Sequence, residues 1–181
     1  MKKHCTYLLF VLIALTLITG CSKAQSKADS FNSYFSQLDK NNVAQKKAGD
    51  ELANIAASAA SAQDLKGLDQ KLSAEKTSVQ KLLAEYKSIS EPKELTQYKG
   101  TATEILNKRL EHVVIITDIL NYINANDYKN PELLDKLNKL MAIQKDINEK
   151  EQSNVDLLSK IAKDNNLSIA KGDKIRFEAI K

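Results

Sequence analysis

The amino-acid sequence predicts an all-α fold: an antiparallel four-helix bundle of long helices, followed by a short C-terminal tail. Three observations support this prediction. The 181 residues are rich in Ala, Leu, Lys, Glu and Gln but include only five Gly and two Pro, a composition that favours helix. Apolar residues recur at spacings of three and four along extended stretches. The connections between these stretches are short, so consecutive helices must fold back on one another.

The first predicted helix covers residues 30–62. Its last part, residues 53–62 (ANIAASAASA), is rich in small side chains, which allow a neighbouring helix to approach closely. We interpret this part as a tightly packed helix end rather than as a docking surface. The apolar positions that define the helix are Phe31, Tyr34, Leu38, Ala48, Leu52, Ile55 and Ala59.

The second predicted helix begins after Asp64, a good N-cap residue, and continues to Ile89. Its apolar residues follow a nearly unbroken heptad order, which is the spacing of a helix that packs along one seam. These residues are Leu65, Leu68, Leu72, Val79, Leu82, Tyr86 and Ile89.

The third and fourth helices are each introduced by a proline. Pro92 follows a capping serine, and Pro131 follows Asn130, so both prolines suit the first turn of a new helix. The third helix ends near Asn124 and contains the run VVII at residues 113–116, which makes it apolar around most of its circumference. The fourth helix carries Leu133, Leu137, Leu140, Ile147, Val155, Leu158 and Ile161.

These helices define a predicted bundle domain over residues 31–166 and a tail over residues 167–181. A longer and thinner coiled-coil hairpin that dimerises is the alternative, but the broad apolar surface of the third helix argues against it. In the tail, apolar residues alternate with charged ones after a turn at residues 171–173. This pattern predicts either a short strand-like strap on the bundle or a loose tail. We favour the docked tail, because Phe177 and Ile180 gain by burial.

The N-terminus has the features of an export signal. Lys2 and Lys3 are followed by an uncharged run over residues 6–20, which is short for a membrane span of about 20 residues. We therefore expect residues 1–20 to be a signal peptide that is cleaved from the mature protein.

The end of this run, Leu17-Ile18-Thr19-Gly20-Cys21, resembles the lipobox of bacterial lipoproteins, although Thr19 is less typical than Ala or Ser. The resemblance implies that Cys21 receives a diacylglyceryl group and that the chain is cleaved between Gly20 and Cys21. Two or three acyl chains hold a protein firmly on a membrane, whereas one chain holds it only marginally. The following small, polar residues, up to residue 30, are predicted to be a tether.

The sequence offers little catalytic or cofactor chemistry. It contains no phosphate-binding glycine loop, nucleophile elbow or calcium loop. Cys5 and His4 lie in the predicted signal peptide, so the mature chain has no disulfide, and His112 is its only histidine. A di-iron bundle site or a c-type haem in its usual form needs more histidines or cysteines. We expect no cofactor, no metal and no enzymatic activity.

Polar residues interrupt the predicted helical seams at four positions. Glu75 lies between Leu72 and Val79 in heptad order, and Arg109 lies on a row with His112 in the third helix. Folding the chain back at the two turns brings Glu75 level with Arg109, and His112 level with Gln144. We therefore predict Glu75–Arg109 and His112–Gln144 contacts in a buried polar layer, because a buried charge without a partner is costly.

The predicted function is that of a non-enzymatic binding or structural module at the cell envelope, anchored to a bacterial membrane through lipid on Cys21. The order of lipobox, tether and Lys/Glu-rich helix, for example residues 72–79 (LSAEKTSV), loosely resembles helical lipoproteins assigned to cell-wall binding. That resemblance implies a cell-wall polymer as the partner; an accessory subunit that docks on a membrane protein complex is the alternative, and a small enzyme is a further, weaker one. The domain would lie outside the cell membrane, or on the outer membrane facing the periplasm. We expect no nucleic-acid binding, since no basic stripe carries interleaved aromatic residues.

Overall fold

The computed structural model describes residues 23–38, 68–127, 129–170 and 174–180, and this part of the chain is mostly helical. The prediction of a mainly helical protein is therefore confirmed. The predicted first helix beyond residue 38, with all of residues 53–62, lies outside the described residues. The described elements are a helix over residues 23–38, α3 (Leu68–Ser88), the short 3-10 helix η1 (Lys93–Leu95), α4 (Thr96–Asn124), α5 (Pro131–Asp164), β1 (Leu167–Ile169) and β2 (Phe177–Ala179).

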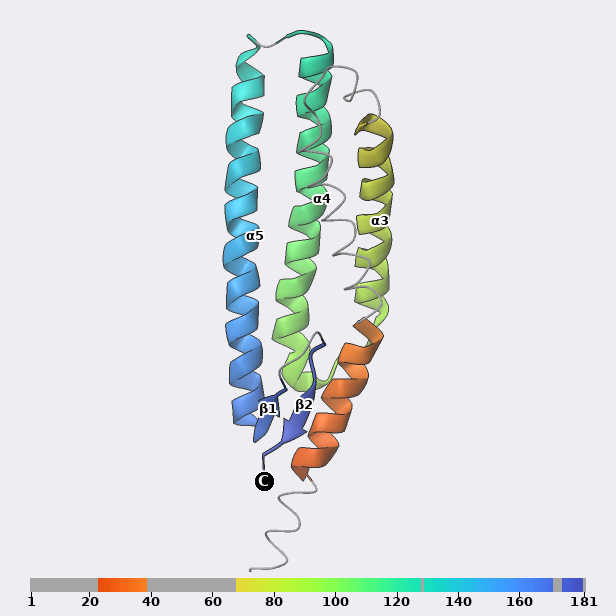
Figure 1. Cartoon of the computed structure of the whole chain (residues 1–181), viewed down its shortest axis with the longest axis vertical. Coiled ribbons are helices and arrows are strands. Elements are labelled where there is room, and N and C mark those ends of the chain that lie inside the picture. The colour runs from red at the N-terminus through yellow and green to blue at the C-terminus, as the bar shows by residue number, and fades with distance from the viewer. Residues whose placement is uncertain (1–22, 39–67, 128, 171–173, 181) are drawn as a thin grey trace, which may run out of the picture.

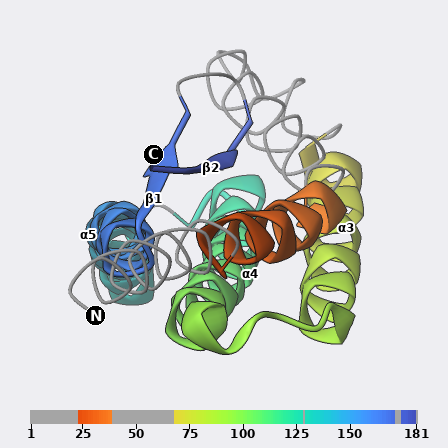
Figure 2. The ribbon, with the colours of Figure 1, turned by 90° about the horizontal axis from the view of Figure 1, so that it is seen from below.

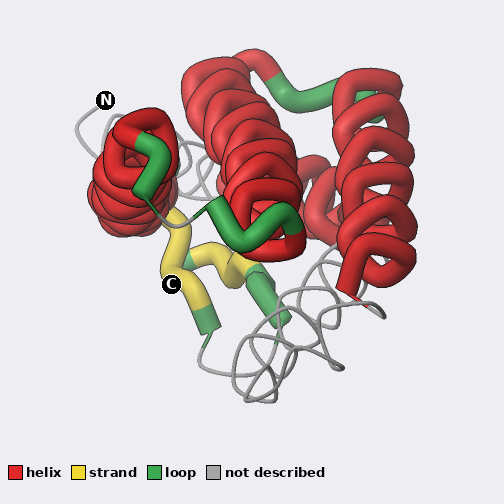
Figure 3. The backbone as a smooth tube through the Cα atoms, turned by 90° about the horizontal axis from the view of Figure 1, so that it is seen from above, coloured by secondary structure: helices red, strands yellow, loops and turns green. Residues whose placement is uncertain are grey.

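The three long helices stand side by side, and each runs antiparallel to the one before it (Figure 1). Helix α4 lies between α3 and α5, as the two end-on views show (Figures 2 and 3). The 34 residues of α5 span about 50 Å at the usual helical rise of about 1.5 Å per residue. The middle position of α4 explains its broad apolar surface, because this helix packs against neighbours on two sides.

Both predicted proline boundaries are helix starts. The Asn130 side chain accepts a hydrogen bond from the Glu132 backbone N–H at 3.0 Å, and Pro131 occupies the first turn of α5. Pro92 precedes η1, which continues directly into α4. These local signals place the starts of α4 and α5 close to where the sequence predicts them.

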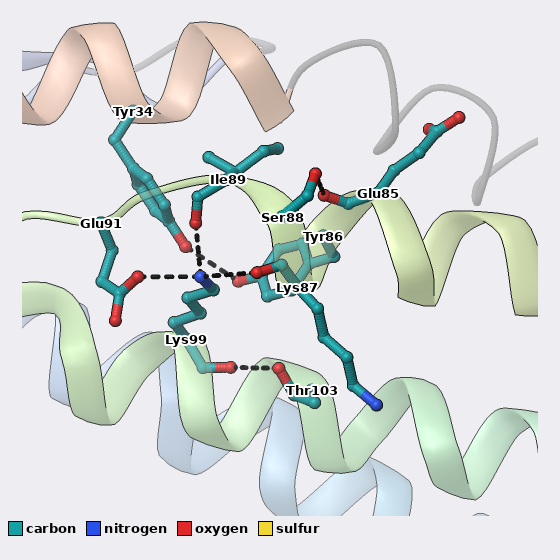
Figure 4. Close-up of polar contacts among 9 residues, drawn as sticks. All are labelled: Tyr34, Glu85, Tyr86, Lys87, Ser88, Ile89, Glu91, Lys99 and Thr103. Atoms are coloured by element: carbon teal, nitrogen blue, oxygen red, sulfur yellow. Dashed lines mark hydrogen bonds and ion pairs between the residues drawn. The ribbon is translucent and has the colours of Figure 1, made fainter.

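A lysine closes the turn between α3 and α4 (Figure 4). The Lys99 ammonium, on the first turn of α4, lies 2.8 Å from Glu91 Oε2. It also donates to the backbone carbonyls of Ile89 and, at 3.4 Å, Lys87, at the C-terminal end of α3. The last carbonyls of a helix have no partner within the helix, so Lys99 caps α3 from the next element.

Among the described residues, the buried apolar side chains form three clusters. One lies between α3 and α4 and includes Leu72 and Val113; another lies between α4 and α5 and includes Ile105 and Ile147. The largest section, at the end of the molecule that holds the hairpin and residues 23–38, contains most of the buried aromatic side chains: Phe31, Tyr34, Phe35, Tyr86 and Phe177.

Residues 23–30 are helical, so the predicted polar tether is wrong over these residues. Ala24 and Ala28 are buried in the main core section, and the helix continues without a break through residue 38. Alanine has the highest helix propensity, and its small side chain allows this helix to lie close to its neighbours. Within the described residues, packing therefore begins at residue 23 rather than at the predicted residue 31.

The tail forms a two-stranded antiparallel hairpin in which Ile169 pairs with Phe177. This element departs from the all-α prediction, but the predicted docking of Phe177 is confirmed, because only 2% of this residue is exposed. The prediction for Ile180 is wrong: it is 55% exposed, beyond the end of β2. Asn32 holds β2 in place, donating from Nδ2 to the Phe177 carbonyl at 2.9 Å and accepting from the Phe177 N–H at 2.7 Å.

Candidate functional site

The predicted lipidation and cleavage residues, Cys21 and Gly20, lie outside the described residues, so their prediction stays untested by the structure. The first described residue is Lys23, two positions after Cys21. Among the described helices, none is both long and apolar enough to cross a membrane.

Arg109 has a partner other than the predicted Glu75. Glu75 is buried on α3, 9% exposed, as its heptad position indicates. Arg109 instead lies 2.5 Å from Glu151 on α5. The physical reason is the face of α4: Ile105, one turn before Arg109, packs against α5, and Arg109 follows it to that side.

The predicted His112–Gln144 contact is also wrong. Gln144 is exposed and donates to Asn148 Oδ1 at 2.9 Å along its own helix, whereas His112 is half-buried. Lys108, one turn before His112 on α4, forms an ion pair with Asp146 on α5 at 3.2 Å. Burial and, secondarily, the positive charge of Arg109 lower the pKa of His112 below its ordinary value of 6.5.

A cavity of about 580 Å³ is the strongest candidate site in the part of the chain that the structure describes. It lies between the lower halves of α4 and α5, with the β-hairpin and the end of the first helix completing its wall. Most of the lining is apolar: Leu38, Ala102, Ile105, Leu106, Val155, Leu158, Ile169 and Ile175. The polar lining residues are Tyr86, Tyr98, Arg109, Glu151, Asn154 and Ser159.

Asn154 is the most unusual residue of this cavity. It is only 6% exposed, and its Oδ1 accepts no hydrogen bond from any described residue. A buried carbonyl oxygen without a partner costs roughly 1–3 kcal/mol, and such groups are rare in folded proteins. Asn154 thus lines a mainly apolar cavity, while its Oδ1 is itself buried and lies out of reach of the cavity space.

The other polar groups of the cavity are neutral or mutually compensated. Burial raises the pKa of Tyr98 to about 12, and burial together with the hydrogen bond between Tyr86 and Tyr34, at 3.2 Å, raises the pKa of Tyr86 further. Both phenols therefore keep their protons at neutral pH. The Arg109–Glu151 ion pair is partly exposed and cancels its own charge.

The arrangement has the features of a binding cavity. Ser159, the hydroxyl-bearing serine of the lining, donates to the Val155 carbonyl within its own helix, and no base approaches it among the described residues. No group of three or more His, Cys, Asp or Glu side chains is placed to hold a metal within the described ranges. A cavity with apolar walls and a few polar groups is the usual form of a small-molecule site.

The sequence contained a signal for this site that the heptad assignment missed. Asn154 stands seven residues after Ile147 and seven before Ile161, so it occupies a core row of α5. The prediction instead assigned the neighbouring Val155 to the core, and Val155 is 59% exposed. A polar residue in an apolar row of a helix indicates either a buried polar contact or a binding site. Asn154 is such a residue.

Comparison of the chain with protein-family models, with curated proteins and with solved structures gives no match. The case for function therefore depends on the residues and the geometry described above.

Proposed function

We propose that the protein is an exported bacterial lipoprotein, anchored through acyl chains on Cys21, whose helical domain is a non-enzymatic binding module at the cell envelope. The observation that carries this proposal is the lipobox-like run Leu17-Ile18-Thr19-Gly20-Cys21 behind a basic, then uncharged N-terminus. The thiol is the side chain suited to thioether formation, and residue 20 is small enough for a peptidase to approach the backbone.

The short distance between Cys21 and the folded domain supports a specific geometry for the anchored protein. The helix that carries buried Ala24 and Ala28 is already formed at residue 23. With only one residue between it and Cys21, the domain would stand close to the lipid headgroups. The hairpin end would face the membrane, and the α4–α5 turn, at the opposite end of the long helices, would project about 50 Å outward (Figure 1).

The finer architecture in this proposal is an antiparallel four-helix bundle. Helices α3, α4 and α5 would be three of its members, and the fourth would require the predicted first helix to continue to residue 62. A bundle of this kind presents long, charged helix surfaces, and a cell-wall polymer is the partner that we propose for them. Ion pairs between α4 and α5, such as Lys136–Asp118 at 2.7 Å and Lys139–Glu111 at 2.9 Å, leave this surface with closely mixed charges.

Metabolic labelling with a fatty-acid analogue tests the anchor. Wild-type protein should take up the label and sediment with membranes, whereas Cys21→Ser should lose the label and retain residues 1–20, because the hydroxyl cannot replace the thiol. Cys5→Ser is the matched control: it removes the other cysteine of the chain and should be labelled like wild type. Equal labelling of Cys21→Ser and wild type would refute the lipoprotein assignment.

The alternative function, an accessory subunit that docks on a membrane protein complex, is favoured by one observation. Helix α5 exposes Leu134, Leu137 and Met141, at spacings of three and four that place them on one face near the α4–α5 turn. An exposed apolar stripe of this kind is typical of a protein contact.

Co-purification distinguishes the two functions. A wall-binding protein should be retained on purified wall polymer, and Leu134→Gln with Met141→Gln should not change the retention. An accessory subunit should instead remain with a complex in detergent-solubilised membranes, and the same double variant should release it.

A further inference from the structure

We propose that two copies of the protein pair along one exposed face of α5, as a parallel homodimer on a single membrane. Helix α5 is an outer member of the row of three long helices (Figure 3). The face in question, called the α5 outer face, consists of exposed residues at successive spacings of three and four: Leu134, Leu137, Met141, Gln144, Asn148, Gln152, Val155 and Ser159. The occupant is a second copy of this chain, in place of the membrane complex of the alternative function.

Large apolar side chains on the α5 outer face are unusually exposed. Leu134, Met141 and Val155 are each more than half exposed, and Leu137 is 40% exposed. The first three residues are separated by multiples of seven, so they hold the same heptad position and extend for about 32 Å along the helix. A heptad row of this kind is suited to a second helix that runs alongside it.

The charges of the α5 outer face are compatible with a copy of itself. Every residue of the face is apolar or neutral, although 28% of the chain is charged. Beside the face, Lys145 is paired with Glu149 on the same helix at 3.7 Å, so this flank does not present a single sign of charge. Like charges brought opposite each other would oppose a homodimer, and this face brings none together.

Asn148 favours a parallel dimer in a fixed register. It holds the same heptad position as Met141 and Val155. In a parallel pair of helices, identical positions face each other, and one asparagine among apolar residues at this position specifies register and a two-stranded state. The amide both donates and accepts, so Asn148 of one copy can bond to Asn148 of the other. Its Oδ1 accepts from Gln144 at 2.9 Å and has a second lone pair for this bond.

The size of the α5 outer face predicts a dimer that depends on the membrane. A strip about 32 Å long and about 10 Å wide offers on the order of 300 Å² per copy, below the roughly 800 Å² of a standard interface. Two copies anchored in one membrane have a raised effective concentration, which compensates for a small contact. Their α5 helices would also point the same way. The parallel orientation therefore rests on the proposed lipid anchor, whereas the choice of face rests on α5 alone.

Thiol crosslinking of the full chain in the membranes of its own cells tests the proposal. Cys5 lies in the predicted signal peptide and Cys21 would carry lipid, so an introduced cysteine should be the reactive one. Met141→Cys and Val155→Cys, made separately and treated with the short crosslinker bismaleimidoethane, should each yield a covalent dimer. Ser153→Cys is the matched control: it is exposed on the same helix but at the heptad position farthest from the outer face, and should yield several-fold less dimer.

The use of two positions tests the orientation. A parallel pair in register joins each of Met141→Cys and Val155→Cys to its own copy, because identical positions face each other along the whole helix. An antiparallel pair brings at most one of the two positions opposite itself. Peptide mass spectrometry identifies the joined residues, so a reaction of Cys5 or Cys21 is distinguished from a contact on α5.

A charge at the asparagine position tests the contact itself. Asn148→Glu in the Val155→Cys background should reduce the covalent dimer about tenfold, because it places two carboxylates opposite each other. Ser153→Glu adds the same charge at the control position and should leave the yield unchanged. Both residues are exposed, and helical circular dichroism should show both variants folded as wild type.

The anchor and the dimer are contradicted by different results. Loss of fatty-acid label from the variants would refute the anchor, whereas labelled protein without crosslinks at positions 141 and 155 would overturn the dimer alone. The dimer is also overturned if only one position crosslinks, if Ser153→Cys yields as much, or if the crosslinked partner is a different protein.

Discussion

At the residue scale, the Asn32 side chain forms the hydrogen bonds that a third strand would form with the edge of β2. Its side-chain amide presents one donor and one acceptor to the N–H and C=O of Phe177, at 2.7 and 2.9 Å. The edge of β2 is thereby satisfied by a helix, 145 residues away in the sequence. These two hydrogen bonds orient β2 so that the Phe177 ring meets the Phe31 ring edge-to-face, with ring centres 5.1 Å apart.

Asn32→Asp should lower the free energy of unfolding by about 2–3 kcal/mol, because a carboxylate has no N–H for the Phe177 carbonyl and places negative charge against it. Urea unfolding followed by circular dichroism measures the loss. Ser33→Asp is the control: it introduces the same charge on the exposed neighbouring residue and should change stability by less than about 0.5 kcal/mol. Equal effects of the two variants would show that the double hydrogen bond contributes nothing.

His112 gives a second prediction at this scale, concerning pH. Its pKa is lowered in the folded state, first by burial and then by Arg109, so the unfolded chain binds the proton more tightly. Stability should therefore fall as the pH drops below the unfolded value of about 6.5. His112→Gln should flatten the dependence of the unfolding free energy between pH 7.5 and 5.5. If the unfolding free energy of the variant depends on pH as steeply as that of wild type, His112 is not the group responsible.

At the scale of elements, Lys99 links the end of α3 to the start of α4 (Figure 4). Lys99→Met should lower the unfolding free energy by about 1–2 kcal/mol, because it leaves the Ile89 carbonyl and the Glu91 carboxylate without their charged donor. Lys87→Met is the matched control, since it removes an exposed lysine from the last turn of α3. Chemical denaturation that gives equal losses for both variants would argue against the cap.

The helices themselves could be predicted from the sequence because their signals are local. Asn130-Pro131 and Pro92 mark helix starts, and heptad spacing placed Leu72 and Glu75 on the buried face of α3. The lateral contacts could not be predicted in the same way. A helix between two neighbours has two buried rows, and spacing alone does not decide which neighbour Arg109 faces. The cavity lined by Asn154 was missed for a related reason. The spacing of apolar residues in α5 allows either Asn154 or Val155 to be the buried position, and the apolar Val155 was chosen.

At the scale of the whole molecule, the N-terminal helix and the C-terminal hairpin belong to one core. Phe177 contacts both Phe31 and Phe35, and the second pair of ring centres is 5.4 Å apart. Such contacts leave no periodic trace in the sequence, so the docked helix over residues 23–30 was mistaken for a tether. These residues are small and mostly polar, with two alanines in the core, and such a composition is compatible with a docked helix and with a tether.

Phe177→Ala should therefore destabilise the whole domain, by about 3–5 kcal/mol, rather than loosen the tail alone. Ile180→Ala, at an exposed position of the same segment, should stay within about 0.5 kcal/mol of wild type. Thermal unfolding monitored by helical circular dichroism measures both. A Phe177→Ala variant that keeps the wild-type transition would mean that the hairpin rests on the bundle without stabilising it.

The lipid anchor is the central claim at this scale, because it places the hairpin end of the molecule at a membrane. Mass spectrometry of the protein isolated from the membranes of its own cells tests this claim most directly. The account predicts a chain that lacks residues 1–20 and begins at Cys21, with the mass of a diacylglyceryl group, with or without a further acyl chain, on the N-terminal peptide. A chain that retains residues 1–20, or one that begins at Cys21 with an unmodified thiol, would contradict it.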